Sequence, residues 1–312
     1  MRIVFAGTPG FSIPCLEALL TDDYFEVVGV LSQPDRRSGR GMKLTPSPVK
    51  QRALDVGLDV LTPERLRENS EALNWLLDKQ ADVLVVVAFG MILPCEWLAA
   101  PRIAPVNVHA SLLPRWRGAA PIERAFLAGD SETGVCIMHM QQGLDTGGVY
   151  ASRRVPISAS LTGAQLWSSL STSGAELLIE TLPDIASGAL PAVAQDDALA
   201  TYAAKLDNRE RMIDWTASAA QVDRQVRCFS PRPGARTRLD GKWLKLLSGE
   251  ICSEKTACVP GSIVGDDFRV ACGDGLLYQV LNVQAEGKKA MDAASFLRGQ
   301  SLKAGEVLGA DD

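Results

Sequence analysis

The stretch VLVVVAFG, residues 83–90, is apolar at every position before its closing glycine. Four of its first five residues are valine, whose branched side chain favours an extended backbone over a helix. A short run without polar alternation predicts a strand buried on both faces, as in the parallel sheets of α/β proteins.

Similar apolar runs occur on both sides of this stretch and alternate with helical patterns. We expect strands at 3–7, 25–33, 83–90, 105–110 and 133–140, and helices at 13–21, 63–80, 121–129 and 161–188. The alternation predicts an α/β fold with a Rossmann-like, doubly wound and mostly parallel sheet. Ligands of such sheets bind at the carboxyl ends of the strands, so functional side chains are expected there.

The pattern changes after an Ala/Pro-rich passage near residue 190. One amphipathic helix, 213–229, is followed by short strand-like pieces that are separated by Asp-Gly and Gly-Asp turns. These pieces predict a smaller, OB-like antiparallel β-barrel. We therefore expect a catalytic domain over 1–189, a linker over 190–205 and a C-terminal barrel domain over 206–312.

The composition of the 312-residue chain excludes several classes of protein. Seven cysteines form no CxxC pair and only two histidines could join them, which argues against disulfides and against a metal site. The first residues form a strand-like run rather than a secretory signal, and the apolar run 83–93 is too short to cross a bilayer. We expect a cytoplasmic monomer that binds neither a metal nor a membrane.

The charge of the chain is unevenly distributed. A net charge of −5 argues against a protein that is basic overall and binds nucleic acid by charge alone. Residues 209–245, however, hold nine Lys/Arg against four Asp/Glu. This local excess indicates a polyanionic partner on one face, although a solvated charged surface has the same pattern.

Polar residues of catalytic type follow two neighbouring predicted strands. Asn107 and His109 are two positions apart, so on a strand their side chains point to one face and the flanking valines point to the other. Asp145 lies in QQGLDTGG, residues 141–148, a loop after the next predicted strand. Because neighbouring strand ends meet at one edge of an open sheet, we expect the three side chains to converge.

These three residue types suit acyl transfer. The Asn107 amide can donate a hydrogen bond to a developing oxyanion, and the His109 imidazole can do the same or move a proton. A carboxylate close by, here Asp145, favours the protonated imidazolium. No Ser or Cys occupies a nucleophile-elbow motif, so direct attack by a substrate amine is favoured over a covalent acyl-enzyme.

Each residue also has a simpler interpretation. His109 could be a hydrogen-bonded core residue, Asp145 could make an Asx turn, and Asn107 could do no more than end a strand. The second histidine, His139, is expected to share a strand face with Val135 and to be structural.

Motifs of one protein family recur along nearly the whole chain in a single order. They are FAGTPGF (5–11), QPDRRSGRGMKLTPSPVK (33–50), VVVAFGMILP (85–94), NVHASLLPRWRGAAPI (107–122), GLDTG (143–147), TYAAKL (201–206) and IDW (213–215). By these motifs the chain resembles the 10-formyltetrahydrofolate-dependent formyltransferase family. The second and fourth motifs, through QPDR…GRG…SPVK and PRWRGAAPI, resemble its tRNA-specific branch.

The resemblance implies a role for each matching residue. Asn107, His109 and Asp145 would form the catalytic triplet. The folate would be held by Ser111, Leu112, Leu113 and Pro114 and, around its pterin ring, by Phe89, Gly90, Met91, Ile92 and Leu93. The tRNA would contact the loop residues Arg36, Arg37, Arg40 and Lys43 and the barrel residues Arg232, Arg236, Arg238, Lys242 and Lys245.

The same resemblance implies the reaction. The α-amino group of methionyl-initiator tRNA would attack the formyl group of 10-formyltetrahydrofolate, giving formylmethionyl-tRNA for translation initiation. Asn107 and protonated His109 would stabilise the oxyanion, and Asp145 would orient and charge the histidine. The folate is then a co-substrate consumed in each turnover, and no metal is needed.

The sequence leaves three other functions open. The same triplet could formylate a small amine, such as a purine-pathway ribonucleotide or a nucleotide sugar, but the GRG loop and the partly basic barrel argue against this. A nicotinamide-dependent oxidoreductase is disfavoured because GTPG, residues 7–10, lacks the G-x-G-x-x-G spacing. A non-catalytic RNA-binding module would leave the Asn107, His109 and Asp145 arrangement without a purpose.

Overall fold

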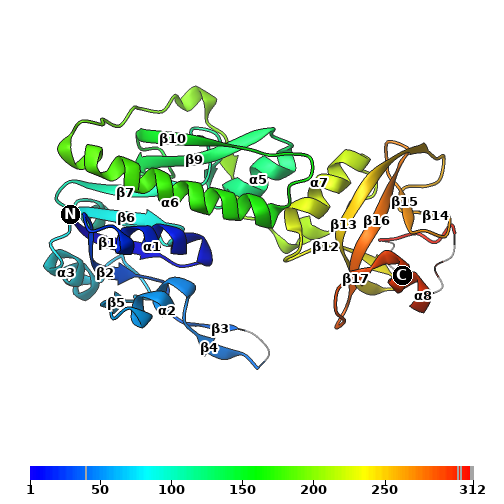
Figure 1. Cartoon of the computed structure of the whole chain (residues 1–312), viewed down its shortest axis with the longest axis horizontal. Coiled ribbons are helices and arrows are strands. Elements are labelled where there is room, and N and C mark those ends of the chain that lie inside the picture. Colours follow the sequence, from blue (N-terminus) through cyan, green and yellow to red (C-terminus); the bar gives the residue numbers. More distant parts are fainter. Residues whose placement is uncertain (39–40, 301, 303, 310–312) are drawn as a thin grey trace. The chain divides into compact units, whose positions relative to one another are not determined.

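The computed structural model describes residues 1–38, 41–300, 302 and 304–309 and divides into two compact units (Figure 1). The N-terminal unit comprises Met1–Pro121, Glu132–Pro156 and Trp167–Ala203. The C-terminal unit comprises Ile122–Ser131, Ile157–Leu166 and the chain from Ala204 onward. The domain limits that we expected from the sequence, with a linker over 190–205, stay a prediction.

In the described part of the chain, the N-terminal unit is built on a seven-stranded sheet with the order β10-β9-β7-β6-β1-β2-β5. Its strands are β1 (Arg2–Gly7), β2 (Glu26–Leu31), β5 (Val60–Leu61), β6 (Val83–Val87), β7 (Ala104–His109), β9 (Glu132–His139) and β10 (Val149–Pro156). The first five of these strands run parallel. At one edge β9 runs antiparallel to β7, and β10 pairs antiparallel with β9. The expected mostly parallel, doubly wound sheet is confirmed.

Helices cover both faces of this sheet. α3 (Ser70–Asp78) and α4 (Cys95–Leu98) pack on one face through a buried cluster that includes Val4, Val86 and Trp97. α1 (Ile13–Thr21) and α6 (Gly163–Ser187) lie over the other face (Figure 1). α6 approaches β7 closely because residue 174 is glycine: a Cβ there would lie 2.9 Å from Cγ1 of Val108.

The sequence pattern misses several short elements of the structure. These are η1 (Gly10–Ser12), the hairpin of β3 (Arg36–Ser38) and β4 (Lys43–Thr45), α2 (Pro48–Asp55), β5, α4, β8 (Arg117–Gly118), β10, η2 (Asp197–Leu199), β11 (Tyr202–Ala203) and η3 (Asn208–Arg211). β10 escapes notice because it is an edge strand whose side chains are mostly half-exposed. α3 begins at Ser70 rather than at residue 63, because the Asn69 side chain caps it by accepting a hydrogen bond from the backbone of Ala72.

The C-terminal unit contains an antiparallel half-barrel. Its strands are β12 (Ala235–Leu239), β13 (Lys242–Lys255), β14 (Ile263–Val264), β15 (Arg269–Ala271), β16 (Leu276–Ala285) and β17 (Met291–Asp292), and its helices include α5 (Pro121–Ala128), α7 (Ala219–Phe229) and α8 (Ala293–Gly299). α7 begins at Ala219, later than the predicted residue 213, because Ser218 and Gln221 form a capping box. The predicted small antiparallel barrel domain is confirmed in this form.

We expect Gly174→Ala to lower the free energy of unfolding by about 1–3 kcal/mol, because the β-branched Val108 side chain has little freedom to move aside. Gly299→Ala is the control, since a Cβ at Gly299 would meet no atom within 4 Å. Urea unfolding followed by circular dichroism measures both effects. Equal effects of the two substitutions would contradict the close approach of α6 to β7.

Candidate active site

The carboxyl end of β7 presents two polar side chains on one face. Asn107 pairs with Val86 of β6 in the parallel register, so it and His109 face the side of the sheet that α3 and α4 cover. Both residues are buried, with 9 % of Asn107 and 6 % of His109 exposed. The strand therefore places an amide and an imidazole side by side in a nearly dry environment.

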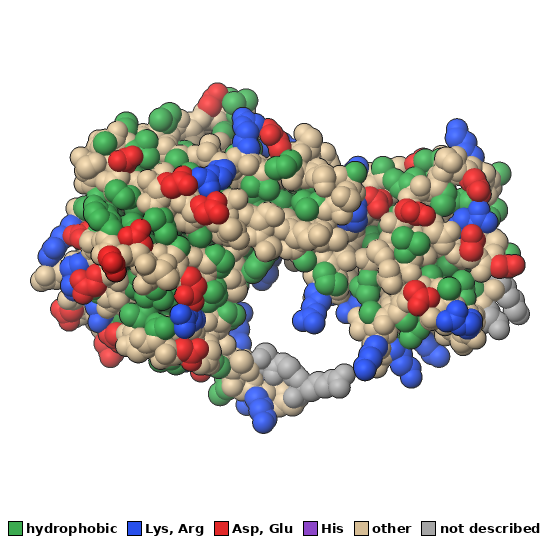
Figure 2. Space-filling view, viewed as in Figure 1, with side chains coloured by type: hydrophobic (Ala, Val, Ile, Leu, Met, Phe, Trp, Pro, Cys, Tyr) green, Lys and Arg blue, Asp and Glu red, His purple; other side chains and the backbone are tan. Residues whose placement is uncertain are grey.

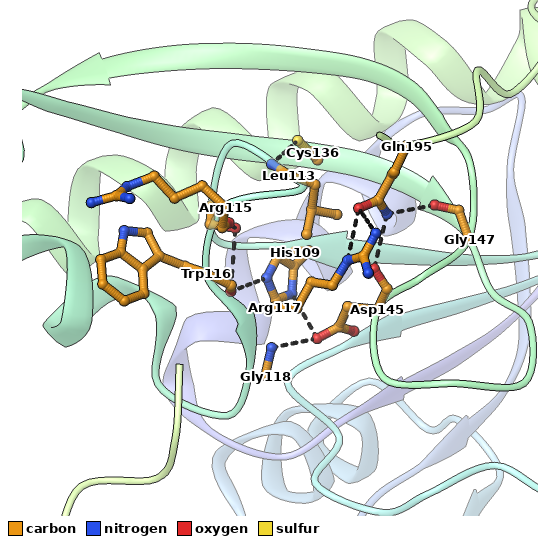
Figure 3. Close-up of polar contacts among 11 residues, drawn as sticks. His109, Leu113, Arg115, Trp116, Arg117, Gly118, Cys136, Asp145, Gly147 and Gln195 are labelled. Atoms are coloured by element: carbon orange, nitrogen blue, oxygen red, sulfur yellow. Dashed lines mark hydrogen bonds and ion pairs between the residues drawn. The ribbon is translucent and has the colours of Figure 1, made fainter. Parts of the chain in front are cut away.

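Both ring nitrogens of His109 face hydrogen-bond acceptors (Figure 3). Nε2 lies 3.0 Å from the backbone oxygen of Trp116, and Nδ1 lies 3.6 Å from Oδ2 of Asp145. A carbonyl oxygen only accepts, so Nε2 carries its hydrogen in this arrangement. Nδ1 then faces the Asp145 carboxylate, so the two acceptors fix the orientation of the ring.

Asp145 belongs to the loop between β9 and β10. Its carboxylate Oδ2 accepts a hydrogen bond of 2.8 Å from the backbone N–H of Gly118, and its side chain is 17 % exposed. Its backbone is left-handed, with a φ of 52°, which costs a non-glycine residue about 1–3 kcal/mol. The surrounding contacts must hold the residue in this conformation.

The Asn107 side chain differs from its two neighbours in having no partner. Among the residues that the structure describes, its amide makes no hydrogen bond. Asn107 is not among the described side chains whose polar atoms are fully buried without a partner, so its amide still reaches solvent. The amide can therefore donate a hydrogen bond to a bound molecule.

The loop after β7 is folded back on itself by Ser111. The Ser111 side chain is fully buried and donates a hydrogen bond of 2.6 Å to the backbone oxygen of Arg115. Trp116 follows with a φ of 63° and turns its carbonyl toward His109. Ser111 thus shapes the segment that supplies the acceptor for the His109 ring.

A cavity of about 620 Å³ lies beside Asp145. Its wall is mostly apolar and includes Met91, Leu98 and Met140, and Gln141 and Gln142 add polar groups. This volume falls within the range of about 300–1,000 Å³ that is typical of small-molecule sites. The cavity is therefore large enough for a flat heteroaromatic ring with polar edges.

The structure places only part of the expected folate residues at this cavity. Met91, Ile92 and Leu93 line it, and Asp145 is the member of the triplet that reaches it. The other candidates, Phe89, Gly90, Ser111, Leu112, Leu113 and Pro114, are not among its lining residues. Phe89 instead packs in the core cluster beneath α3 and α4.

Several lining residues were missed by the sequence reasoning. Gln141, Gln142 and Leu144 adjoin the GLDTG motif, so the motif itself was the signal that could have found them. Arg67 reaches the cavity from the segment before α3, and nothing in its local sequence pattern marks it.

The basic residues expected to bind tRNA lie in both units. Arg36, Arg37 and Lys43 are exposed on the β3–β4 hairpin, and Arg36 donates a hydrogen bond of 2.5 Å to the Gln33 side chain. Arg40, the residue singled out in this loop, lies outside the described residues. Figure 2 shows Lys and Arg side chains gathered along the lower edge of the C-terminal unit.

The strands β12 and β13 carry a basic face around one tryptophan. Arg236 pairs with Lys245 and Arg238 pairs with Trp243, so these four side chains share a face of the sheet. The guanidinium carbons of Arg236 and Arg238 lie 4.1 Å and 4.4 Å from the centre of the Trp243 ring. Such stacking holds both charges in place. Arg232 and Lys242 lie nearby in the sequence and are exposed.

Among the described residues, no group of three or more His, Cys, Asp or Glu is placed to hold a metal ion. No helix in the same residues is long and apolar enough to cross a membrane. All seven cysteines are free thiols. Burial raises the pKa of Cys15 to about 12 and that of Cys136 to about 11, which keeps both thiols neutral.

His139 lies near the end of β9, beside the β7 strand that carries the triplet. Its Nδ1 is 3.1 Å from the hydroxyl of Tyr150, and burial lowers the pKa of its imidazole. Nothing in this environment favours the charged ring.

Comparisons with known proteins find formyl transferases similar to both parts of the chain. A family model described as formyl transferase matches residues 1–182, and a second, described as formyl transferase, C-terminal domain, matches residues 205–301. The chain is 49 % identical over 302 residues to the methionyl-tRNA formyltransferase of Paracoccus denitrificans, covering 97 % of this chain and 98 % of the relative. It is 47 % identical over 309 residues to that of Novosphingobium aromaticivorans, covering 99 % and 100 %.

A solved structure shares the fold. The methionyl-tRNA formyltransferase from Clostridium thermocellum superposes with a TM-score of 0.57 at 13 % identity. The superposition covers 82 % of this chain and 95 % of the other. At this identity the likeness bears on the fold alone.

The lowered pKa of His139 leads to a prediction about how the stability of the fold changes at low pH. Its folded-state pKa lies below the unfolded value of 6.5, so the unfolded chain takes up the proton first as the pH falls. Folding stability is therefore lost below about pH 6.5, and His139→Gln removes this contribution.

We expect the thermal midpoint of the wild type to fall more than that of His139→Gln between about pH 7.5 and about pH 5.5. Differential scanning calorimetry of both proteins at the two pH values measures this. A constant difference between the two midpoints would show that His139 titrates alike in both states.

Proposed function

The chain belongs to the formyl transferase family, and we infer that it transfers the formyl group of 10-formyltetrahydrofolate to the α-amino group of methionyl-initiator tRNA. The product is formylmethionyl-tRNA, the aminoacyl-tRNA that begins translation. The full-length identity to methionyl-tRNA formyltransferases and the presence of both family domains support this substrate.

The observation that carries the proposed chemistry is the approach of the Asp145 carboxylate to the His109 ring, with the Asn107 amide on the same face of β7. Hydrogen-bond donors held in a dry site stabilise a developing negative charge far better than water does. We assign Asn107 and His109 to that role, and we assign Asp145 to orienting and charging the His109 ring.

The cavity beside Asp145 fits the folate. Its apolar wall suits a pterin ring, and Gln141 and Gln142 can hydrogen-bond to ring nitrogens and to the ring carbonyl. The co-substrate supplies the formyl carbon, whose bond to a folate nitrogen is exchanged for a bond to the methionyl amine. We propose that Met91, Ile92 and Leu93 hold the ring, and that Ser111 to Pro114 act by shaping the wall behind His109.

Each residue of the triplet then has its own role in the transfer. The Asn107 amide donates to the oxygen that gains charge as the amine attacks, and the His109 Nε2–H is proposed to exchange the Trp116 carbonyl for that oxygen during the reaction. The Asp145 carboxylate keeps the ring charged, and a water molecule is proposed to carry away the proton of the amine. No side chain needs to form a covalent bond with the substrate.

Two basic surfaces are proposed to hold the tRNA. On the N-terminal unit it is the β3–β4 hairpin with Arg36, Arg37 and Lys43, together with Arg40. On the C-terminal unit it is the β12–β13 face with Arg232, Arg236, Arg238, Lys242 and Lys245. Side chains of this kind contact phosphates and position a nucleic acid without reading its bases.

The proposed function also bears on the cellular compartment and the oligomeric state of the protein. Initiator tRNA and translation are in the cytoplasm, so we propose that the protein acts there. We also propose that it acts as a monomer, because the triplet and the cavity are built from one chain.

We predict that Asn107→Ala, His109→Ala and Asp145→Ala each lower kcat for formyl transfer by about a hundredfold to a thousandfold, since each removes a group from the oxyanion site. His139→Gln is the matched control on the neighbouring strand and is expected to keep its turnover. Formylation of charged initiator tRNA, with free amines as competing substrates, measures all four. Near-normal turnover of a triplet variant would remove that residue from the mechanism.

We predict that Lys43→Ala and Lys242→Ala each raise the KM for tRNA and leave the KM for folate unchanged. Each should also reduce the slope of log KM against log salt concentration by about 1, because one phosphate contact is lost. Lys255→Ala, another exposed lysine of the C-terminal unit, is the control. A rise in both KM values would indicate a structural role instead.

A further inference from the structure

Among the described residues, side chains of the loop that carries Asp145 are anchored only at its start: Gln142 donates a hydrogen bond to the Cys95 sulfur, and the Thr146 hydroxyl donates to the Gln142 backbone oxygen at 3.3 Å. Neither contact reaches the backbone of Asp145. Residues 141–144 are exposed, and the Asp145 backbone is left-handed. The Gly118 N–H holds the carboxylate, but this contact does not hold the backbone from which the side chain departs. A second contact is needed to fix the loop.

That contact comes from Gln195, fifty residues further along the chain (Figure 3). Its side-chain nitrogen donates to the backbone oxygen of Asp145 at 2.8 Å and to that of Gly147 at 2.6 Å. One amide group therefore ties down both ends of the three-residue segment that presents the carboxylate.

Gln195 is itself fixed by a buried charge. Its side-chain oxygen accepts from Nε of Arg117 at 3.0 Å and from Nη2 of Arg117 at 2.9 Å. A guanidinium only donates and a carbonyl only accepts, so the amide has one orientation that satisfies all four contacts. The Arg117 side chain is 2 % exposed and also pairs with Asp197 at 2.7 Å.

Arg117 keeps its positive charge although it is buried. Burial by itself would lower the pKa of its guanidinium, but hydrogen bonds to Asp197 and Tyr202 outweigh burial and raise the pKa. The segment that carries Gln195 is also anchored, because Val193 exchanges backbone hydrogen bonds with Val149 of β10. Gln195 thus reaches the Asp145 loop from a segment that is hydrogen-bonded to β10.

We propose that Gln195 is a positioning residue for the formyl transfer reaction, which acts by holding the backbone of Asp145 so that its carboxylate meets His109. This inference rests on the proposed function. Gln195 touches neither substrate in this role, and Arg117 acts one step further back by orienting Gln195. A loop shift of about 1 Å at such a site can lower the rate by about a hundredfold.

The test is a double-mutant cycle. Gln195→Leu is expected to lower kcat by about tenfold to a hundredfold with both KM values nearly unchanged. In the Asp145→Ala background the same substitution is expected to change kcat by less than about twofold, because the residue it serves is gone. An equal loss in both backgrounds, or no loss in the first, would overturn the proposal.

Two further variants separate positioning from folding. Gln195→Glu keeps the acceptor for Arg117 but removes the donor to the loop, so it should lose as much kcat as Gln195→Leu while keeping a thermal midpoint closer to the wild type. Gln225→Leu is the matched control, since the Gln225 amide also donates to two backbone oxygens, at 2.7 Å each, within the C-terminal unit. It should lower the midpoint and leave kcat unchanged.

A measurement that does not depend on catalytic turnover distinguishes failure of the Gln195 proposal from failure of the proposed function. Deuterium uptake of the peptide 141–148 should be faster in Gln195→Leu than in the wild type, and unchanged in Gln225→Leu. Unchanged uptake in Gln195→Leu would overturn the positioning role. A wild type that does not formylate methionyl-tRNA, but shows the faster uptake in the variant, would overturn the proposed function alone.

Discussion

The placement of the Asp145 carboxylate beside the His109 ring is the constraint on which the rest of the site depends. The ring's other nitrogen is already committed to the Trp116 carbonyl, so the carboxylate decides how the imidazole is held. The backbone of Asp145 is strained, and the free energy for this strain must come from its surroundings. The site is therefore only as well ordered as the contacts that hold one aspartate.

The fold supplies those contacts from segments far apart in the sequence. β7 presents His109 at its carboxyl end, β8 supplies the Gly118 N–H, and the segment after α6 supplies Gln195. Gly147 allows the loop to close, because a Cβ there would lie 1.8 Å from the backbone oxygen of His139. The two antiparallel strands at the edge of the sheet thus serve to deliver a loop to the end of a parallel strand.

Much of the fold and of the candidate site could be predicted from the sequence. The elements and contacts that could not be predicted were missed for physical reasons. Long apolar runs such as 83–87 were recognisable because burial on both faces leaves no polar position. Edge strand β10 and hairpin β3–β4 were not recognisable, since exposed strands lack that pattern. Arg236 and Arg238 were predicted as basic surface residues, but their stacking on Trp243 depends on the register of two strands, which no local pattern states.

The sequence by itself determined the fold class and the three side chains of the candidate site, because strand periodicity and motif spacing are local properties of the chain. It also determined that the stretch 209–245 carries an excess of positive charge in a chain that is acidic overall. Only the tertiary structure decided that Phe89 is core, that Met91 to Leu93 face a cavity, and that Gln195 reaches Asp145. Those facts depend on hydrogen bonds and packing between residues distant in the chain, which form only when the sheet has brought them together.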